Sequence, residues 1–328
     1  MRDFQRNVRR TGETGQAVVV IALLMIGLVA MLGLVLDGGN AYAQRRRMQN
    51  AADAAALAGA GRMSQSGTSN QQVLASVNEY ATRNGASPNP PAYYIRSNGH
   101  QMNRVASYPA YDQPPQGAVG VHVTTTLTVQ TYFLGALGIN TFTAFADAAA
   151  MAGPAGSVVG LVPWALNWDA ASAPNGARVS LGSSAGSDGT YNYESIDTDR
   201  EGLGNFRHAM CAGIRQGVAI SPRRYHAVLS PKFTPDERDC LQQRLTARPG
   251  ETWDHFASDS PRVMLLPVLD GTAGDGYVNV KAFRAFFLEA ADVRNSLAYG
   301  RFVRLIVSHA TLDFSAPNTG VWVVKLTR

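Results

Sequence analysis

The feature that most constrains this chain is an uninterrupted apolar segment close to its N-terminus. Residues 17–36 read AVVVIALLMIGLVAMLGLVL, twenty positions without a charged or strongly polar side chain. A helix of this length is about 30 Å long, which equals the hydrocarbon thickness of a bilayer. A core helix of a soluble protein usually shows a polar face within so many residues. The sequence therefore predicts a transmembrane helix over residues 17–36, preceded by a cytoplasmic tail over residues 1–16.

The charges on the two sides of this segment are nearly balanced, so its orientation depends on further features. Four arginines precede the segment and three follow it at residues 45–47. The short tail carries more of the positive charge and a large folded part follows, which favours a cytoplasmic N-terminus. We therefore expect a single-pass protein of the cytoplasmic (inner) membrane with an extracytoplasmic C-terminal domain. An A-x-A sequence at residues 41–43 keeps signal-peptide cleavage as an alternative, although the apolar run exceeds a usual signal sequence.

An alanine-rich segment follows the apolar run over residues 37–63. Its alanine density gives it high helix propensity, so we expect it to extend the membrane helix. Small or flexible side chains recur there at helical spacing and would suit close helix–helix packing. These predicted packing residues are Met48, Ala52, Ala55 and Ala56. A plain stalk helix is the alternative interpretation.

The motifs in this region resemble those of a known family. Gly15-Gln16-Ala17 precedes the apolar helix, Asp37 and Tyr42 follow it, and residues 49–60 read QNAADAAALAGA. This pattern resembles the N-terminal module of TadE/TadG-like proteins, which belong to Flp pilus-assembly (tight-adherence) systems. The resemblance implies a bitopic, non-enzymatic protein of pilus assembly or adhesion. Its implied partners are membrane lipid and pilins, pseudopilins or other pilus-assembly proteins.

A second, looser similarity and two departures refine this expectation. A valine- and threonine-rich segment over residues 119–129 precedes YFLGALGIN at residues 132–140, as in many such proteins. Five residues after Gly15 stands Val20, where processed pseudopilins have glutamate, which argues against prepilin-peptidase processing. The string at residues 313–317, DFSAP, lacks the final serine of the metal motif of a von Willebrand factor A domain. We therefore do not expect that domain.

The rest of the chain is predicted to be rich in strands. Residues 64–118 contain clusters of Ser, Asn, Gly and Pro and are expected to be a loop-rich connection with a short helix over residues 73–83. Alternating valines over residues 119–129 predict a strand. Further strands are expected over residues 141–149, 263–269, 277–287, 302–309 and 321–326, the second and third as a hairpin, with a capped helix starting at residue 234. The predicted fold class is α+β: a transmembrane helix, its alanine-rich extension and a β-rich extracytoplasmic domain over residues 119–328.

Two cysteines, Cys211 and Cys240, are the only ones in the chain. If they lie outside the cytoplasm, they are expected to form one disulfide, which would stabilise the domain by about 3–4 kcal/mol. Together with His208 and His226 they could supply four zinc ligands, but this spacing matches no zinc module. We therefore predict no metal site and no cofactor.

The charge distribution and the acidic residues argue against nucleic-acid binding and against catalysis. The net charge is +5, but only three of the 29 basic residues are lysine and no basic cluster alternates with aromatics, so we expect no nucleic-acid partner. Two acidic groups, residues 254–259 and 236–239, lack a pattern that assigns them to catalysis. We predict no catalytic residues and no enzymatic activity. A membrane-anchored extracytoplasmic hydrolase or a glycan-binding adhesin remains the alternative.

Overall fold

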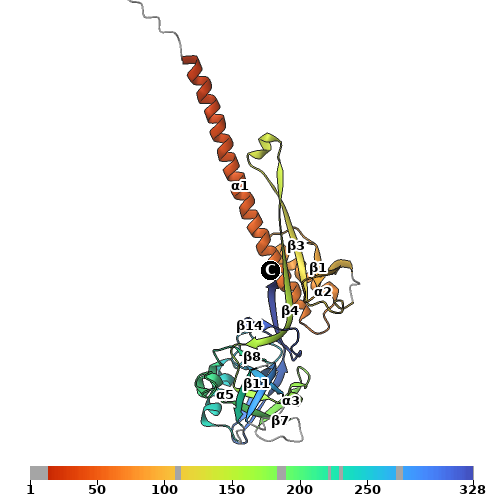
Figure 1. The fold of residues 1–328 in the computed structure, drawn as a ribbon, viewed down its shortest axis with the longest axis vertical. Coiled ribbons are helices and arrows are strands. Elements are labelled where there is room, and N and C mark those ends of the chain that lie inside the picture. The colour runs from red at the N-terminus through yellow and green to blue at the C-terminus, as the bar shows by residue number, and fades with distance from the viewer. Residues whose placement is uncertain are drawn as a thin grey trace, which may run out of the picture.

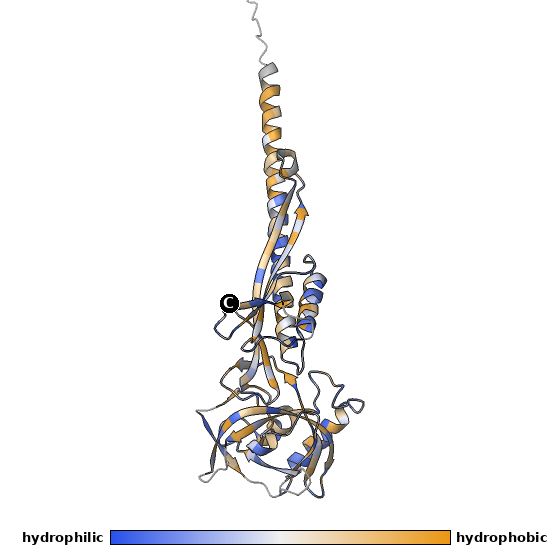
Figure 2. Ribbon diagram, turned by 90° about the vertical axis from the view of Figure 1, so that its right-hand side faces the viewer, coloured by the Kyte–Doolittle hydropathy of each residue, from blue (hydrophilic) through white to orange (hydrophobic). Residues whose placement is uncertain are grey.

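The molecule is built on one long helix that carries two β-sheets at its C-terminal side (Figure 1). The computed structural model describes residues 14–107, 112–182, 190–220, 223–228, 232–270 and 276–327. Helix α1 runs without a break over Thr14–Met63. Its N-terminal part projects beyond the folded region and is strongly apolar (Figure 2). Among the described residues α1 is the one helix long and apolar enough to cross a membrane. The predicted apolar helix with an alanine-rich extension is therefore confirmed.

The first sheet covers the alanine-rich part of α1. Its strand order is β13-β15-β4-β3-β1-β2, with β8 and β14 also paired to β4. The long strands β3 (Gly120–Gln130) and β4 (Thr141–Val158) pair in antiparallel fashion and form an arm along the helix. The other strands are β1 (Ala92–Ile95), β2 (Gln101–Arg104), β8 (Val218–Ala219), β13 (Leu305–Ile306), β14 (Ala310–Leu312) and β15 (Val321–Thr327).

A short helix, α2 (Asn70–Arg83), packs on α1 within the segment expected to be mostly loops. It begins three residues before the predicted start because Ser69 caps it. The Ser69 hydroxyl accepts from the Gln72 N–H, and the Gln72 side chain accepts from the Ser69 N–H. Its apolar face, with Val73 and Val77, is buried against α1. Two 3₁₀ turns complete this region, η1 (Val105–Ser107) and η2 (Leu134–Leu137).

The second sheet lies at the end of the molecule farthest from the apolar segment (Figure 1). Its order is β10-β5-β7-β6-β12-β11-β9, and β10 also pairs with β11. That additional pairing closes the sheet on itself, which removes most free edges. Its strands are β5 (Trp164–Leu166), β6 (Arg178–Gly182), β7 (Thr190–Ile196), β9 (Arg224–Val228), β10 (Val263–Asp270), β11 (Tyr277–Asp292) and β12 (Leu297–Val303). Helices α3 (Trp168–Ala171), α4 (Phe206–Ala212) and α5 (Pro235–Ala247) accompany them.

The chain passes between the two sheets near its C-terminal end. The sequence suggests one strand over residues 302–309, but β12 ends at Val303 and β13 starts at Leu305 in the first sheet. Arg304 lies at the change of sheet and donates to Ser64 just beyond α1. Strand β15 then pairs with β4. Residues 119–328 thus contribute to both sheets, and the mixed α+β class is confirmed.

Candidate functional site

The predicted packing residues of α1 lie on one face of the helix, and this face is covered by the chain's own sheet. Their side chains have no exposed surface, and they share a core with alanines of β4. The set consists of Met48, Ala52, Ala55 and Ala56. Small side chains on both sides allow a close approach, so that the Thr125 hydroxyl donates directly to the Met48 carbonyl at 2.8 Å. This stripe therefore packs within the molecule.

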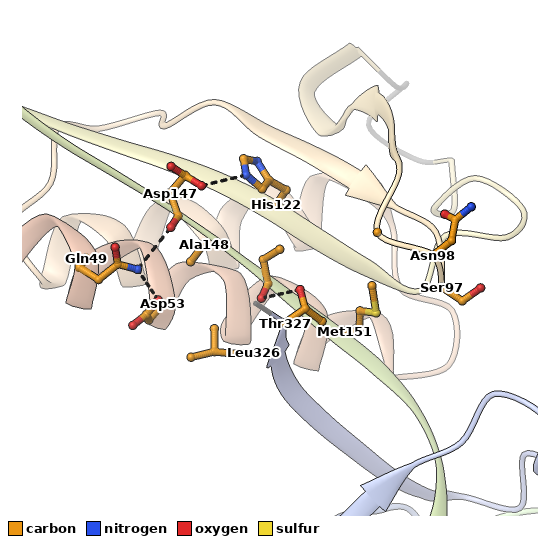
Figure 3. A pocket seen from close by; sticks show the side chains of 12 residues that line it. Gln49, Asp53, Ser97, Asn98, His122, Asp147, Ala148, Met151, Leu326 and Thr327 are labelled. Atoms are coloured by element: carbon orange, nitrogen blue, oxygen red, sulfur yellow. Dashed lines mark hydrogen bonds and ion pairs between the residues drawn. The ribbon is translucent and has the colours of Figure 1, made fainter.

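A polar groove of about 970 Å³ opens beside this packed face. It lies between α1, the β3–β4 arm and the last residues of β15 (Figure 3). The Gln49 amide donates to the Asp53 carboxylate at 2.9 Å and to the Asp147 carbonyl at 3.3 Å. On the other side of Asp147, its carboxylate lies 3.5 Å from Nε2 of His122. Helix and sheet thus hold four polar side chains around one open surface.

The arrangement of the groove suits recognition. It offers carboxylates and amide groups on an accessible surface, and the Asp147 side chain is 63% exposed. Polar, accessible groups around a concave surface are typical of the rim of protein interfaces. The described residues contain no group of three His, Cys, Asp or Glu side chains that could hold a metal ion.

Sequence reasoning did not select the residues of this groove, although a signal is present. Gln49 lies just before an alanine run and Asp53 within it, and Asp147 interrupts a second alanine-rich segment at residues 144–150. A polar residue in such a run costs helix or sheet packing unless its side chain reaches solvent or a partner. The sequence does not show that the alanine-rich segment of β4 packs against the alanine-rich segment of α1, so the groove between them could not be predicted.

Cys211 and Cys240 are joined by a disulfide that links α4 to α5, with their Cα atoms 4.7 Å apart. The bonded sulfurs are not thiolates and so cannot serve as metal ligands or nucleophiles in this state. His226 lies on β9, where its Nδ1 is 3.6 Å from an Asp197 carboxylate oxygen. His208 lies in the first turn of α4, where its N–H donates to the Asn205 side chain. Of the four residues considered as zinc ligands, the two cysteines are thus consumed by the disulfide, His208 shares α4 with Cys211, and His226 lies on β9 beside Asp197.

A buried arginine reinforces the contact between α4 and α5. The Arg244 guanidinium of α5 donates twice to the Met210 carbonyl of α4, at 2.9 and 3.2 Å. Burial lowers the pKa of Arg244 to about 10, so it stays protonated at neutral pH. The pair of helices is therefore held by one covalent and one charged contact.

The acidic residues weighed as catalytic candidates have structural partners. Glu237 completes the predicted capping box with Thr234 and accepts from the buried Trp164 indole at 2.6 Å. Burial raises the pKa of Tyr193, and the adjacent Glu237 carboxylate raises it further. Asp236 and Asp239 both accept from Arg207, at 2.7 and 3.2 Å. These contacts explain the 236–239 group by helix capping and ion pairing.

The second acidic group is also held in structural contacts. Asp259 makes two hydrogen bonds with Arg248, at 2.9 and 2.8 Å. These bonds hold the pKa of Asp259 below its usual range. Asp254 lies in a turn closed by two backbone hydrogen bonds between Thr252 and His255, each 3.0 Å long. A carboxyl group such as that of Asp259, whose pKa is lowered in this way, is ionised at neutral pH and is a poor proton donor.

Family comparisons cover the part of the chain that contains α1 and the arm. Residues 15–62 match the model of the TadE/G-like Flp pilus-assembly family. Residues 58–150 match the model of the Tad-like Flp pilus-assembly family. Residues 15–150 are similar to Tad-type Flp pilus-assembly proteins.

The similarity expected from the QNAADAAALAGA run is therefore confirmed. The two matches extend from the apolar helix to the first part of β4 and include Gln49, Asp53, His122 and Asp147. No curated protein and no solved structure matches the chain.

Proposed function

We propose that this protein is a membrane-anchored, non-enzymatic component of a Flp/Tad-type pilus assembly or adhesion system. The observation that carries the proposal is the division of α1 into two halves. Every residue of the apolar segment 17–36 except Gly33 is exposed, whereas the alanine-rich half is built into the first sheet. One continuous helix therefore connects a membrane-spanning segment directly to a folded domain. We place the N-terminus in the cytoplasm and this domain outside the inner membrane.

The polar groove is the surface that we assign to docking. It lies between the arm and the alanine-rich half of α1, about 20 Å along the helix from the end of the apolar segment, where the outer part of a neighbouring membrane-anchored subunit would approach. The exposed carboxylate of Asp147 and the half-buried carboxylate of Asp53 favour a basic or amide-bearing segment of that partner. Pilins, pseudopilins and other pilus-assembly proteins are the partners that the family similarity supports.

The alternatives, an extracytoplasmic hydrolase or a glycan-binding adhesin, gain no specific support within the described residues. Cys211 is oxidised, and the carboxylates of Asp236, Asp239 and Asp259 are engaged by arginines. The groove has the accessible polar lining of a docking surface. Docking thus accounts for more of the observed geometry than catalysis does.

The direct test is charge reversal in the groove, followed by measurement of surface pili and of co-purified assembly proteins. We expect Asp147→Lys to reduce both strongly, with normal protein level, because a lysine would repel a basic partner. Asp199→Lys is the matched control, because Asp199 is an exposed aspartate in the second-sheet region. Wild-type piliation in Asp147→Lys would show that the groove is not the docking surface. Wild-type piliation in a strain without the protein would remove the pilus role.

A further inference from the structure

The tip of the β3–β4 hairpin is fixed to α1 at the end of the apolar segment (Figure 1). Asp37 is only 2% exposed, and its carboxylate accepts three consecutive backbone N–H groups of the tip. The distances are 2.7 Å from Tyr132, 2.9 Å from Phe133 and 2.7 Å from Leu134. Hydrogen bonds to an ionised carboxylate are among the stronger ones in proteins. The tip is thus held at a defined height along the helix.

From this contact the tip extends along the apolar segment toward the N-terminus. A Cβ atom added to Gly33 would lie 2.5 Å from Cβ of Phe133, so the glycine allows the ring to lie against the helix. Gly33 is about 6 Å along the axis from Asp37, at 1.5 Å per residue. An apolar cavity of about 360 Å³ continues this contact, lined by helix residues from Met25 to Leu34 and by Phe133, Leu134 and Ala136 of the tip. The tip therefore lies beside residues that the membrane would surround.

The exposed surface of the tip, on the side away from α1, is also apolar enough to lie in hydrocarbon. The tip, residues 132–139 (YFLGALGI), contains no charged residue. Two large side chains of the tip are strongly exposed, Tyr132 at 73% and Ile139 at 51%, and the Phe133 ring, which lies against the helix at Gly33, is still 41% exposed. Aromatic residues, tyrosine in particular, are enriched where a protein passes from hydrocarbon to the headgroups. An apolar, aromatic surface of this kind beside a spanning helix matches a lipid environment.

Most of the backbone N–H groups of the tip, and several of its C=O groups, also have hydrogen-bond partners within the protein, as a water-free environment requires. Non-helical backbone is tolerated at membrane depth only where its polar groups have partners. Besides the three bonds to Asp37, the Ala136 and Ile139 N–H groups donate to Phe133 and Leu134 carbonyls at 3.0 and 3.1 Å. The Thr131 N–H donates to the Asn140 carbonyl at 3.0 Å, and the Thr131 hydroxyl donates to the Ile139 carbonyl at 2.6 Å. Most of the turn is therefore satisfied within the molecule.

We propose that the tip of the β3–β4 hairpin, residues 132–139, inserts into the outer leaflet of the membrane beside α1. Lipid is the occupant of its exposed surface because that surface is continuous with the lipid-facing side of the apolar segment. Two points of insertion fix the rotation and tilt of the outer domain relative to the bilayer, which a single helix leaves free. The orientation of the docking groove is set by the same contact. The inference rests on the proposed membrane anchoring and is independent of the pilus role.

A depth measurement on the full-length protein in phosphatidylcholine–phosphatidylglycerol vesicles tests this proposal. Both native cysteines are bonded to each other, so Ile139→Cys supplies a single thiol for an environment-sensitive nitrobenzoxadiazole label. Ile139 is half exposed, so the substitution leaves the core intact. Phe145→Cys is the matched control, an apolar position on β4 that is 60% exposed. Phe145 pairs with Thr126, next to the Thr125 contact with Met48, about 16 Å along α1 on the water side of Asp37.

We expect the label at position 139 to be quenched by shallow spin-labelled lipid and to show roughly threefold less quenching by aqueous iodide than the label at 145, since hydrocarbon excludes the anion. Equal iodide quenching at both positions would overturn the proposal. The proposal would also be overturned if the label at 139 were protected from iodide but not quenched by spin-labelled lipid, and if this protection increased with the protein-to-lipid ratio. A second protein copy would then cover the tip. Loss of protein from the vesicles at alkaline pH would instead overturn the anchoring itself, which separates the two failures.

Discussion

The two halves of α1 each present an apolar surface, yet these two surfaces occupy opposite environments. Residues 17–36 are mostly large aliphatic side chains that are exposed to the surroundings of the molecule. Residues 48–60 are mostly alanines that are buried beneath the first sheet and α2. The difference between the two apolar surfaces is therefore side-chain size. Large side chains offer surface to lipid, whereas small ones permit a sheet and a second helix to approach the backbone closely.

Two close contacts of the alanine-rich half show why small residues are required there. A Cβ atom added at Gly59 would lie 2.7 Å from Cγ2 of Val77 on α2. At Met48 the helix carbonyl itself accepts from a strand hydroxyl. Larger side chains in this half would separate the sheet from the helix, and protein interiors tolerate such overpacking poorly.

The largest expected effect is that of a charge placed in the buried half. Ala55 has no exposed surface, so Ala55→Asp would bury an unpaired carboxylate and is expected to cost about 4 kcal/mol or more. The measurement is the fraction of the first-sheet region that resists limited proteolysis in detergent. Asp substituted at Ala54, which is partly exposed on the same helix, should be much milder. Equal protease resistance of wild type and Ala55→Asp would contradict the packing described for this half.

Removing the disulfide tests whether the second sheet and the α1 region differ in stability independently of each other. The Cys211→Ser/Cys240→Ser variant is expected to lose about 3–4 kcal/mol of stability, because the bridge restricts the unfolded chain between α4 and α5. The loss should appear as a lower thermal transition of the second-sheet region while the α1 region keeps its protease resistance. A transition that shifts equally in both regions would show that they unfold as one unit.

A matched pair of size changes tests the comparison of the two halves directly. Ala55→Leu is expected to destabilise the molecule by about 1–3 kcal/mol through overpacking. Ala22→Leu, the same substitution in the exposed half, should leave the midpoint of denaturant unfolding unchanged. If both variants shift the midpoint alike, side-chain size does not distinguish the halves.

The smallest expected effect is local and concerns the hairpin tip. Asp37→Asn leaves one carbonyl oxygen where two carboxylate oxygens accept three N–H groups, so the tip should detach more often from α1. We expect faster protease cleavage within residues 131–140 and an unchanged global transition. Asp53→Asn, a carboxylate elsewhere on the helix, should cleave at the wild-type rate. An unchanged cleavage rate in Asp37→Asn would show that the Asp37 carboxylate does not hold the tip.

Local patterns in the sequence predicted the elements whose causes are local. The apolar run and the alanine run gave the extent of α1, and the Thr234–Glu237 spacing gave the start of α5. Strands over residues 263–269 and 277–287 pair as the predicted hairpin, although the residues between them, 271–275, lie outside the described part. Each of these signals lies within a few residues of the element it specifies.

Contacts between distant segments were not predictable in the same way. The sequence marked Asp37 only as a motif residue that follows the apolar segment, because its partner Tyr132 is 95 residues away. The change of sheet at Arg304 depends on a contact with Ser64, 240 residues earlier. The groove also arises from contacts between distant segments, because it forms where β4 packs across α1. Periodicity records which face of an element is buried and does not record which element covers it.

The most direct measurement is the protease accessibility of a C-terminally tagged protein in intact spheroplasts, with the membrane-bound fragment sized on a blot. An α1 that crosses the membrane and carries both sheets outside predicts that added protease removes the tag and leaves a small N-terminal fragment in the membrane. Full-length tagged protein that stays protected until lysis would place the sheets in the cytoplasm. That result would contradict the anchoring orientation, and with it the docking groove outside the membrane and the insertion of the hairpin tip into the outer leaflet.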